Sequence, residues 1–122
     1  MTQRFLFHAA PPRAREQIRN HGLRPATPTS SRLVAHGPAA VYLFRWRQFA
    51  ENYRLDEAYD VWRVDTDGLD LYADPEDPEA AVYCPARIDP RRLRLLGTYC
   101  GGERTGCSYR DLSRYGYSSR HR

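Results

Sequence analysis

Lysine is absent from this chain, and all 19 of its basic residues are arginine. A GC-rich coding sequence is the favoured cause, and selection for bidentate phosphate contacts is the alternative. The net charge of +4 is unevenly spread along the chain. Residues 1–96 hold 14 arginines and 13 acids, whereas residues 97–122 hold five arginines and two acids. The basic character therefore belongs mainly to the last part of the chain.

Cysteines are few, and long apolar runs are missing. The three cysteines, Cys84, Cys100 and Cys107, are an odd number and form no close pair. This pattern argues against a disulfide framework, and the lack of a C-x-x-C pair argues against zinc. No apolar run approaches the length that crosses a bilayer, and residues 5–7 are too short for a signal peptide. We therefore expect a soluble, cytoplasmic protein without a metal or a membrane partner.

A length of 122 residues corresponds to one domain with a modest core. Apolar patterns bounded by proline and glycine predict its elements. The expected strands are residues 4–8, 40–44, 58–65, 69–72, 80–84 and 93–96, with residues 32–34 as a further possibility, and the expected helices are residues 13–21 and 46–53. In the first helix Ala14 and Ile18 face inward, Gly22 is the C-terminal cap, and Leu23 folds back onto the helix. This order predicts a compact α+β domain with mixed strand pairing and two short helices in the N-terminal half.

Residues 39–53 combine a short apolar strand with a helix that carries aromatic side chains. Trp46, Phe49 and Tyr53 follow the spacing i, i+3, i+7, which places them on one helix face. Tyr42 lies on the preceding strand, so Tyr42 and Tyr53 can face each other across a slot suited to a flat heteroaromatic ring. The alternative is that both tyrosines are core aromatics. Trp46 and Phe49 are expected to be the core that holds this stretch in place.

Residues 97–122 differ in composition from the rest of the chain. Tyrosine and arginine alternate there among glycine and serine, with almost no aliphatic residues. Arginine interleaved with stacking aromatics is typical of a weak, sequence-tolerant nucleic-acid binder. The alternative is a solvated tail.

Two further features carry chemistry: a histidine, His8, at the end of the first strand, and the acidic segment 73–79, which enters a strand at Glu79. A histidine at a strand end is more often a structural hydrogen-bonding group, and acidic loops are usually solvated. The order of His8, Tyr42, Tyr53 and Glu79 resembles the His-Tyr-Tyr-Glu pattern of the ADP-ribosyltransferase fold, in its diphtheria-toxin or poly(ADP-ribose) polymerase-like class. The resemblance covers residues 5–96, and its supporting motifs are Leu6-Phe7-His8, Gly22-Leu23-Arg24, Ala40–Phe44, Glu51–Tyr53 and Glu79–Tyr83.

The resemblance implies a split mixed sheet over residues 1–96, followed by the tail 97–122, and an NAD site. In that site His8 would bind the adenosine-side ribose, and Tyr42 and Tyr53 would sandwich the nicotinamide. The backbone of Ala9 would meet the nicotinamide amide, and Arg24 would belong to the cofactor-binding set. Glu79 would be the catalytic carboxylate, acting with His8 and Tyr42, that stabilises the oxocarbenium-like transition state.

The implied activity is NAD-dependent mono-ADP-ribosyl transfer to a protein or nucleic-acid acceptor. Ala9 and Ala10 stand where the family has glycine and serine or threonine, and Ala50 where it often has serine. These departures favour the alternative of a catalytically degenerate module that binds NAD, ADP-ribose or a partner. A slip of the strand by two residues would also put Ala81 in place of Glu79. An RNA 2′-phosphotransferase-like enzyme, with Arg4, Arg24 and Arg45 around the phosphate, is a further alternative.

Overall fold

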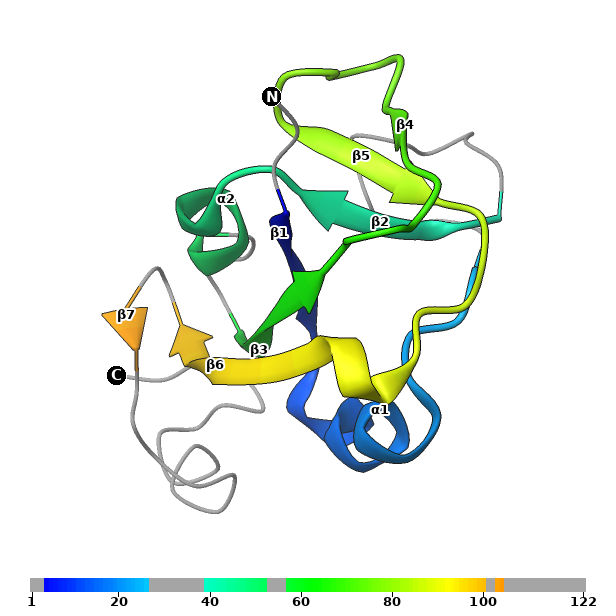
Figure 1. Ribbon diagram of the computed structural model, residues 1–122. Coiled ribbons are helices and arrows are strands. Elements are labelled where there is room, and N and C mark those ends of the chain that lie inside the picture. The colour runs from blue at the N-terminus through cyan, green and yellow to red at the C-terminus, as the bar shows by residue number, and fades with distance from the viewer. Residues whose placement is uncertain (1–3, 27–38, 53–56, 101–102, 105–122) are drawn as a thin grey trace.

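The computed structural model describes residues 4–26, 39–52, 57–100 and 103–104. Within these residues, seven strands form one sheet in the order β4-β5-β2-β1-β3-β6-β7 (Figure 1). The strands are β1 (Phe5–Ala10), β2 (Val41–Phe44), β3 (Ala58–Asp65), β4 (Tyr72–Ala73), β5 (Ala81–Cys84), β6 (Leu93–Cys100) and β7 (Glu103–Arg104). The helices are η1 (Pro12–Ala14), α1 (Arg15–His21), α2 (Arg47–Glu51) and η2 (Pro90–Arg92). The expected α+β class with two short helices in the N-terminal half is therefore confirmed.

Strand pairing in this sheet is antiparallel at every junction between the described strands. The expectation of mixed pairing was wrong. It followed from the strand–helix–strand order, which suggests a parallel crossover. Element order does not fix strand direction, however, because the long segment between α1 and β2 lets the chain return from either end of the sheet.

The central strand β1 pairs over very different lengths with its two neighbours, β3 and β2. Strand β1 pairs with β3 along its whole length, from Phe5 opposite Asp65 to Ala10 opposite Asp60. On its other side β1 meets β2 at a single register position, Phe7 opposite Phe44. The strands β1 and β2 thus remain paired at one end and are not paired beyond it. The sheet is nevertheless continuous across this junction, with β2 and β1 as neighbours.

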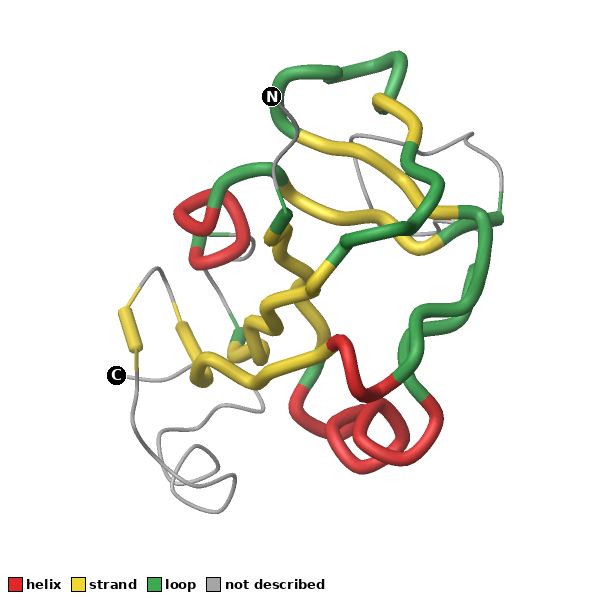
Figure 2. The backbone as a smooth tube through the Cα atoms, in the orientation of Figure 1, coloured by secondary structure: helices red, strands yellow, loops and turns green. Residues whose placement is uncertain are grey.

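Two hydrophobic clusters form the core, and the alternation of side chains along the strands puts them on opposite faces of the sheet. Leu6, Trp62 and Val64 belong to the first cluster, which also contains Ile18 of α1. Val61 and Tyr59 belong to the second, which contains Ala50 of α2. Figure 2 shows the red helices in separate places beside the yellow strands. Helices α1 and α2 therefore cover opposite faces of the same sheet.

Helix α1 follows the sequence expectation closely. Pro12 begins the helical segment, Ile18 is buried, and Gly22 is the C-terminal cap with a φ of +77°. Leu23 is buried in the same cluster and forms a bridge with Ile88, whose main-chain N–H and C=O both bond to it. The predicted cap and the predicted return of Leu23 are thus confirmed.

Helix α2 differs from the expectation. Trp46 is 45% exposed and Phe49 is 41% exposed, whereas Ala50 is fully buried. The helix starts at Arg47, and Trp46 has the extended backbone of an N-cap, so helical spacing counted from Trp46 does not apply. The expectation that Trp46 and Phe49 form the supporting core was therefore wrong, and Ala50 fills that position.

The last long strand continues beyond its predicted end. The expected strand 93–96 is the first half of β6, which runs to Cys100 opposite Ala58 of β3. Residues 97–100 thus belong to the sheet, while residues 105–122 of the expected tail and the possible strand at 32–34 lie outside the described residues. Cys84 and Cys100 are both buried. No helix in the described part of the chain has the length and hydropathy of a membrane span.

Candidate functional site

The junction of β1 and β2 joins two of the predicted site residues. His8 lies on β1 and Tyr42 on β2, and the Nδ1 atom of His8 lies 3.0 Å from the main-chain oxygen of Tyr42. A carbonyl oxygen only accepts hydrogen bonds, so Nδ1 carries the proton and donates it. Burial lowers the pKa of His8, and the bond to the Tyr42 carbonyl opposes part of that effect. The ring is therefore neutral at pH 7, and its Nε2 atom is an acceptor.

The side chains of His8 and Tyr42 leave the sheet on different faces. Alternation places His8 with Leu6 and Ala10, on the face of the first cluster, and His8 stands opposite Trp62 of β3. Tyr42 alternates with Leu43 and shares the other face with Phe44. The structure thus brings the two residues together through the main chain of β2 rather than across one slot.

A row of three tyrosines crosses the neighbouring strands on the face of Tyr42. Tyr83 of β5 stands opposite Tyr42 on one side and opposite Tyr72 of β4 on the other. The ring centroids of Tyr42 and Tyr83 are 5.7 Å apart, and those of Tyr83 and Tyr72 are 5.5 Å apart. We call these three residues the tyrosine row. The sequence placed Tyr72 and Tyr83 on expected strands, but their shared face follows only from the pairing of β5 between β2 and β4.

The acidic segment contains a buried carboxylate that sequence reasoning missed. Glu79 is exposed and lies in the turn before β5, where Ala81 stands opposite Phe44 of β2. Asp74, by contrast, is fully buried. Its Oδ1 accepts a hydrogen bond of 2.9 Å from the N–H of Glu76, and its own N–H donates to the carbonyl of Ala81. The buried carboxylate of the acidic segment is thus Asp74, just after β4, and not Glu79, which lies in the turn before β5.

The charge of Asp74 affects the pKa of Tyr42. Burial raises the pKa of the Tyr42 phenol, and the negative charge of Asp74 and the Tyr83 phenol raise it further. Asp74 follows Tyr72 by two residues, so alternation places its side chain on the face of the tyrosine row. The sequence did contain a signal for Asp74, which comes just after a short alternating strand. An Asp side chain at such a place commonly accepts a hydrogen bond from the backbone N–H two residues later.

Two buried polar side-chain atoms in the described residues have no hydrogen-bond partner. They are Trp62 Nε1, a donor, and Asp74 Oδ2, an acceptor. Trp62 is the register partner of His8, and the charge of Asp74 acts on Tyr42. Unpaired buried polar atoms are rare and cost roughly 1–3 kcal/mol each. Both predicted residues at the junction therefore have an unsatisfied polar neighbour.

The other predicted site residues have varied surroundings. Ala9 is partly buried against the second cluster, and Arg24 is exposed just after the α1 cap. Tyr53 lies outside the described residues. Ala50, at the position where the family often has serine, is fully buried in the core. The predicted residues thus gather around β1 and β2 in part, with Glu79 and Arg24 at the surface.

A buried ion pair joins α1 to the sheet. The Nε and Nη2 atoms of Arg15 each donate to Asp60 of β3 over 2.8 Å, and Asp60 is fully buried. Thr98 of β6 accepts from Arg15 and donates to Asp60 over 2.7 Å. Hydrogen bonding to Asp60 raises the pKa of Arg15. Asp60 interrupts the apolar run 58–64, and an acid at an otherwise buried strand position was the signal in the sequence.

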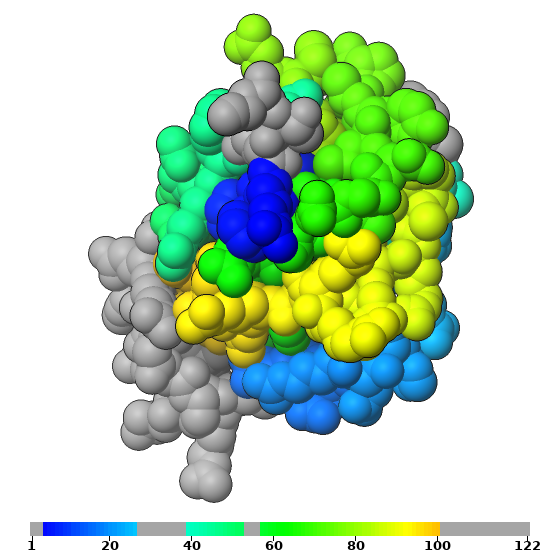
Figure 3. All heavy atoms as spheres, in the orientation of Figure 1, coloured from blue at the N-terminus to red at the C-terminus, as the bar shows by residue number. Residues whose placement is uncertain are grey.

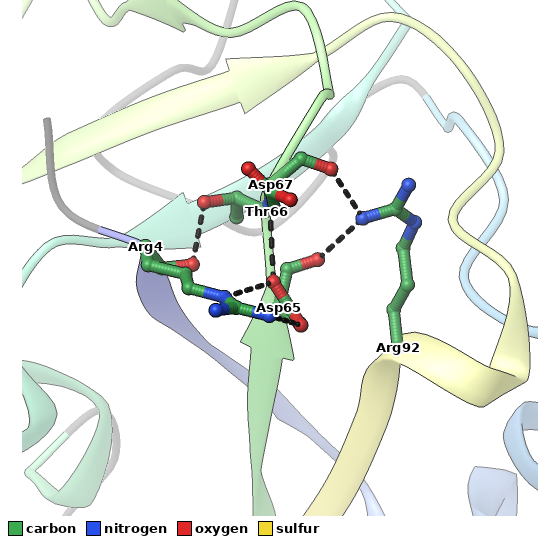
Figure 4. A network of polar contacts seen from close by, with 5 residues as sticks. All are labelled: Arg4, Asp65, Thr66, Asp67 and Arg92. Atoms are coloured by element: carbon green, nitrogen blue, oxygen red, sulfur yellow. Dashed lines mark hydrogen bonds and ion pairs between the residues drawn. The ribbon is translucent and has the colours of Figure 1, made fainter.

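A second polar network holds the start of β1 against the end of β3 (Figure 4). Arg4 donates two hydrogen bonds of 3.0 Å to Asp65, and Arg92 donates to the main-chain oxygens of Asp65 and Asp67. The bonds from Arg4 lower the pKa of Asp65 to about 2, and the N–H of Asp67 contributes. Figure 3 shows the N-terminal end of the described chain, in blue, at the surface next to the green segment. Arg4 is therefore occupied in an ion pair.

Two of the three arginines expected around an RNA phosphate make other contacts. Arg4 pairs with Asp65, and the Nε atom of Arg45 donates to the main-chain oxygen of Pro78 over 2.7 Å. Among the described residues, no group of three or more His, Cys, Asp and Glu side chains is arranged to hold a metal ion. The arrangement thus offers a neutral histidine, a tyrosine row and a buried carboxylate.

No model of a known protein family matches the chain, and no curated protein matches it.

Proposed function

We propose that this chain is an NAD- or ADP-ribose-binding domain with an ADP-ribosyltransferase-like split sheet, and that it binds its ligand at the junction of β1 and β2. The observation that carries the proposal is the pair of unsatisfied buried atoms there. Trp62, whose Nε1 has no partner, is the register partner of His8, and the charge of Asp74, whose Oδ2 has no partner, acts on Tyr42. An unsatisfied donor and an unsatisfied acceptor in the surroundings of the two predicted residues favour a ligand that has polar groups at both ends, as a dinucleotide has.

The chemistry of each residue agrees with this ligand. The acceptor Nε2 of the neutral His8 suits a ribose hydroxyl, which is a donor. The ring of Tyr42 suits a flat heteroaromatic ring, because offset stacking is favourable at centroid separations of about 4.5–7 Å. The sequence resemblance assigns these same partners to His8 and Tyr42. The single register pair between β1 and β2, Phe7 opposite Phe44, supports the proposed split of the sheet at this junction.

Binding without efficient catalysis is favoured by the position of Glu79. This side chain is exposed in a turn, and Ala81 occupies the strand position opposite Phe44. A carboxylate that stabilises an oxocarbenium-like transition state needs a fixed place in a water-excluded site. An exposed side chain in a turn does not meet that need.

Mono-ADP-ribosyl transfer, with NAD as co-substrate, is the second candidate, and the buried Asp74 beside the tyrosine row favours it. In this reaction the bond between ribose C1′ and the nicotinamide nitrogen breaks, and its electron pair leaves with nicotinamide. An acceptor nucleophile on a protein or nucleic acid then bonds to C1′ and loses its proton to solvent. The arginine- and tyrosine-rich residues 97–122 favour a nucleic acid or a ribonucleoprotein as the acceptor.

Calorimetry with NAD and with ADP-ribose tests the binding proposal. We expect binding by the full chain, and a loss of affinity of about tenfold or more in His8→Gln and in Tyr42→Ala. Trp46→Ala, an exposed aromatic outside the junction, is the matched control and should bind as the full chain does. Absence of binding to either ligand by the folded wild-type chain would overturn the proposal.

Nicotinamide release and label transfer from labelled NAD in a cell lysate separate the two candidates. A binding domain retains NAD affinity and shows no turnover in the wild type or in Glu79→Gln. Turnover that survives Glu79→Gln and is lost in Asp74→Asn would establish the transferase with Asp74 as its carboxylate. Turnover lost in Glu79→Gln would instead show that the exposed turn closes onto the substrate.

A further inference from the structure

The tyrosine row has the form of a stacking surface that ends at the edge of the sheet. Tyr42 lies on β2 within the sheet, Tyr83 follows on β5, and Tyr72 lies on β4, the edge strand. The planes of Tyr72 and Tyr83 differ by 30°, and Tyr72 is 50% exposed. Cross-strand aromatic pairs stabilise a sheet by themselves. That role does not require the outermost ring to remain half in solvent.

The unsatisfied oxygen of Asp74 is the second observation at this place. Its Oδ1 is used by the N–H of Glu76, which accounts for the turn. Its Oδ2 is buried and has no partner in the described residues. A turn-forming role explains one oxygen and leaves the other with a desolvation cost. A ligand that donates an N–H to Oδ2 would remove that cost.

We propose that the tyrosine row binds a flat heteroaromatic ring with an exocyclic NH2 group, and that Asp74 Oδ2 accepts a hydrogen bond from that group. The inference rests on the proposed function, since NAD carries two such rings, adenine and nicotinamide. It goes beyond that function by naming Tyr72, Tyr83 and Asp74 as recognition residues. Asp74 is covered in the ligand-free chain, so binding must shift side chains around it and change the environment of the tyrosine rings.

Mononucleotides test the chemistry and distinguish the two rings. The full chain, labelled with 13C in its tyrosine rings, is titrated with AMP and with nicotinamide mononucleotide. The matched probes are inosine monophosphate and nicotinic acid mononucleotide, in which an oxygen replaces the NH2 group. We expect the Tyr72 and Tyr83 signals to move with one NH2-bearing nucleotide, and its affinity to exceed that of its matched probe roughly tenfold.

Two variants assign the effect to the named residues. Tyr72→Ala removes a half-exposed ring and should weaken binding at least about fivefold, as expected for the loss of one stacking contact. Asp74→Asn keeps an oxygen for the Glu76 N–H and adds an NH2 donor. It should therefore abolish or reverse the preference for the NH2-bearing nucleotide. Trp46→Ala is the control for loss of an exposed aromatic outside the row.

The outcomes separate this inference from the proposed function. If NAD binds with dependence on His8 but Tyr72→Ala and Asp74→Asn bind unchanged, the inference is wrong and the proposed function stands. If a mononucleotide binds the row while NAD binding shows no dependence on His8, the inference stands and the proposed function fails. Unmoved Tyr72 and Tyr83 signals with all four nucleotides would overturn the inference.

Discussion

Arg15 and Asp60 show how the stability of this small domain depends on a single buried charge. Asp60 is fully buried on β3, and its two oxygens accept hydrogen bonds from Arg15 and Thr98. A buried ion pair contributes little net stability compared with apolar residues, but removing one partner leaves an uncompensated charge. The main effect of the pair on stability is therefore seen when one partner is removed and the free energy of unfolding falls.

Arg15→Met is expected to lower the free energy of unfolding by about 3 kcal/mol, because Asp60 then remains buried without its partner. Arg19→Met on the same helix is the matched control, since Arg19 pairs with Glu16 at the surface and exposed pairs contribute below about 1 kcal/mol. Urea unfolding at pH 7 measures both changes. Equal losses in the two variants would contradict a special role for the Arg15–Asp60 pair.

His8 makes stability depend on pH near neutrality. Burial lowers its pKa in the folded chain below the ordinary value of 6.5. Between the two pKa values the unfolded chain binds more protons, so stability rises with pH in that range. The contribution of His8 is therefore fully present above about pH 6.5 and is lost as the pH falls toward the folded pKa.

The variant His8→Gln should remove that acid-side decline, since glutamine does not titrate and can still donate to the Tyr42 carbonyl. The free energy of unfolding is measured from pH 8 to pH 5 for both chains. A variant that keeps the full decline of the wild type would show that another group causes it.

At the scale of the element, the end of α1 depends on a glycine for two reasons. Gly22 has a φ of +77°, which costs other L-residues energy, and a Cβ there would overlap the carbonyl of Ile88. Gly68 has a similar φ of +81°, but no atom lies within 4 Å of a Cβ placed on it. The two positions therefore separate backbone strain from steric overlap.

Gly68→Ala is expected to cost about 1 kcal/mol from the positive φ alone. Gly22→Ala is expected to cost roughly 2–4 kcal/mol, because the overlap with Ile88 adds to the strain of a backbone, φ +77° and ψ −165°, that is nearly confined to glycine. Thermal or urea unfolding of the two variants measures the difference. If both lose the same amount, the Gly22 backbone moves away from Ile88 without cost.

The sequence predicts those elements that have local signals. Pro12, the inward-facing Ile18 and the Gly22 cap define α1, and the Tyr- and Val-rich run 58–65 coincides with β3. Helix α2 was misjudged because the extended backbone of Trp46 shifts the helical face toward Ala50. Whether a residue is the N-cap or the first helical residue depends on tertiary packing, which aromatic spacing does not reveal.

The candidate site depends on contacts that are distant in sequence, so it was only partly predictable. His8 and Tyr42 were predicted from their order, and a hydrogen bond across 34 positions joins them. Asp74 and the tyrosine row depend on which strands flank β5, and strand order is not encoded locally. The acidic segment 73–79 was recognised, but the buried member of the segment is Asp74 and not Glu79.

At the scale of the whole molecule, the net positive charge is concentrated in the last part of the sequence. Residues 105–122 contain Arg110, Arg114, Arg120 and Arg122 and one acid, Asp111, which gives +3 of the total +4. Deleting these residues should weaken binding to single-stranded RNA. It should also reduce the slope of log affinity against log salt by up to about 3, or roughly 0.7 for each lost phosphate contact.

Filter binding between 50 and 200 mM salt, with the full chain and the chain ending at Arg104, measures that slope. A version with the same four arginines in scrambled order is the control, because an electrostatic interaction tolerates the change. An affinity that does not vary with salt would contradict a charge-driven contact.

The position of β1 in the sheet has a consequence for synthesis of the protein. Of the described strands, the earliest along the chain is the central one, and its long partner β3 starts only at Ala58. On the ribosome, Phe5 to Ala10 must therefore wait with one edge unpaired until residues 58–65 have emerged. Contacts so distant in sequence are slow to form, and an unpaired apolar strand invites aggregation meanwhile. The nascent chain is thus most in need of a chaperone before β3 is complete.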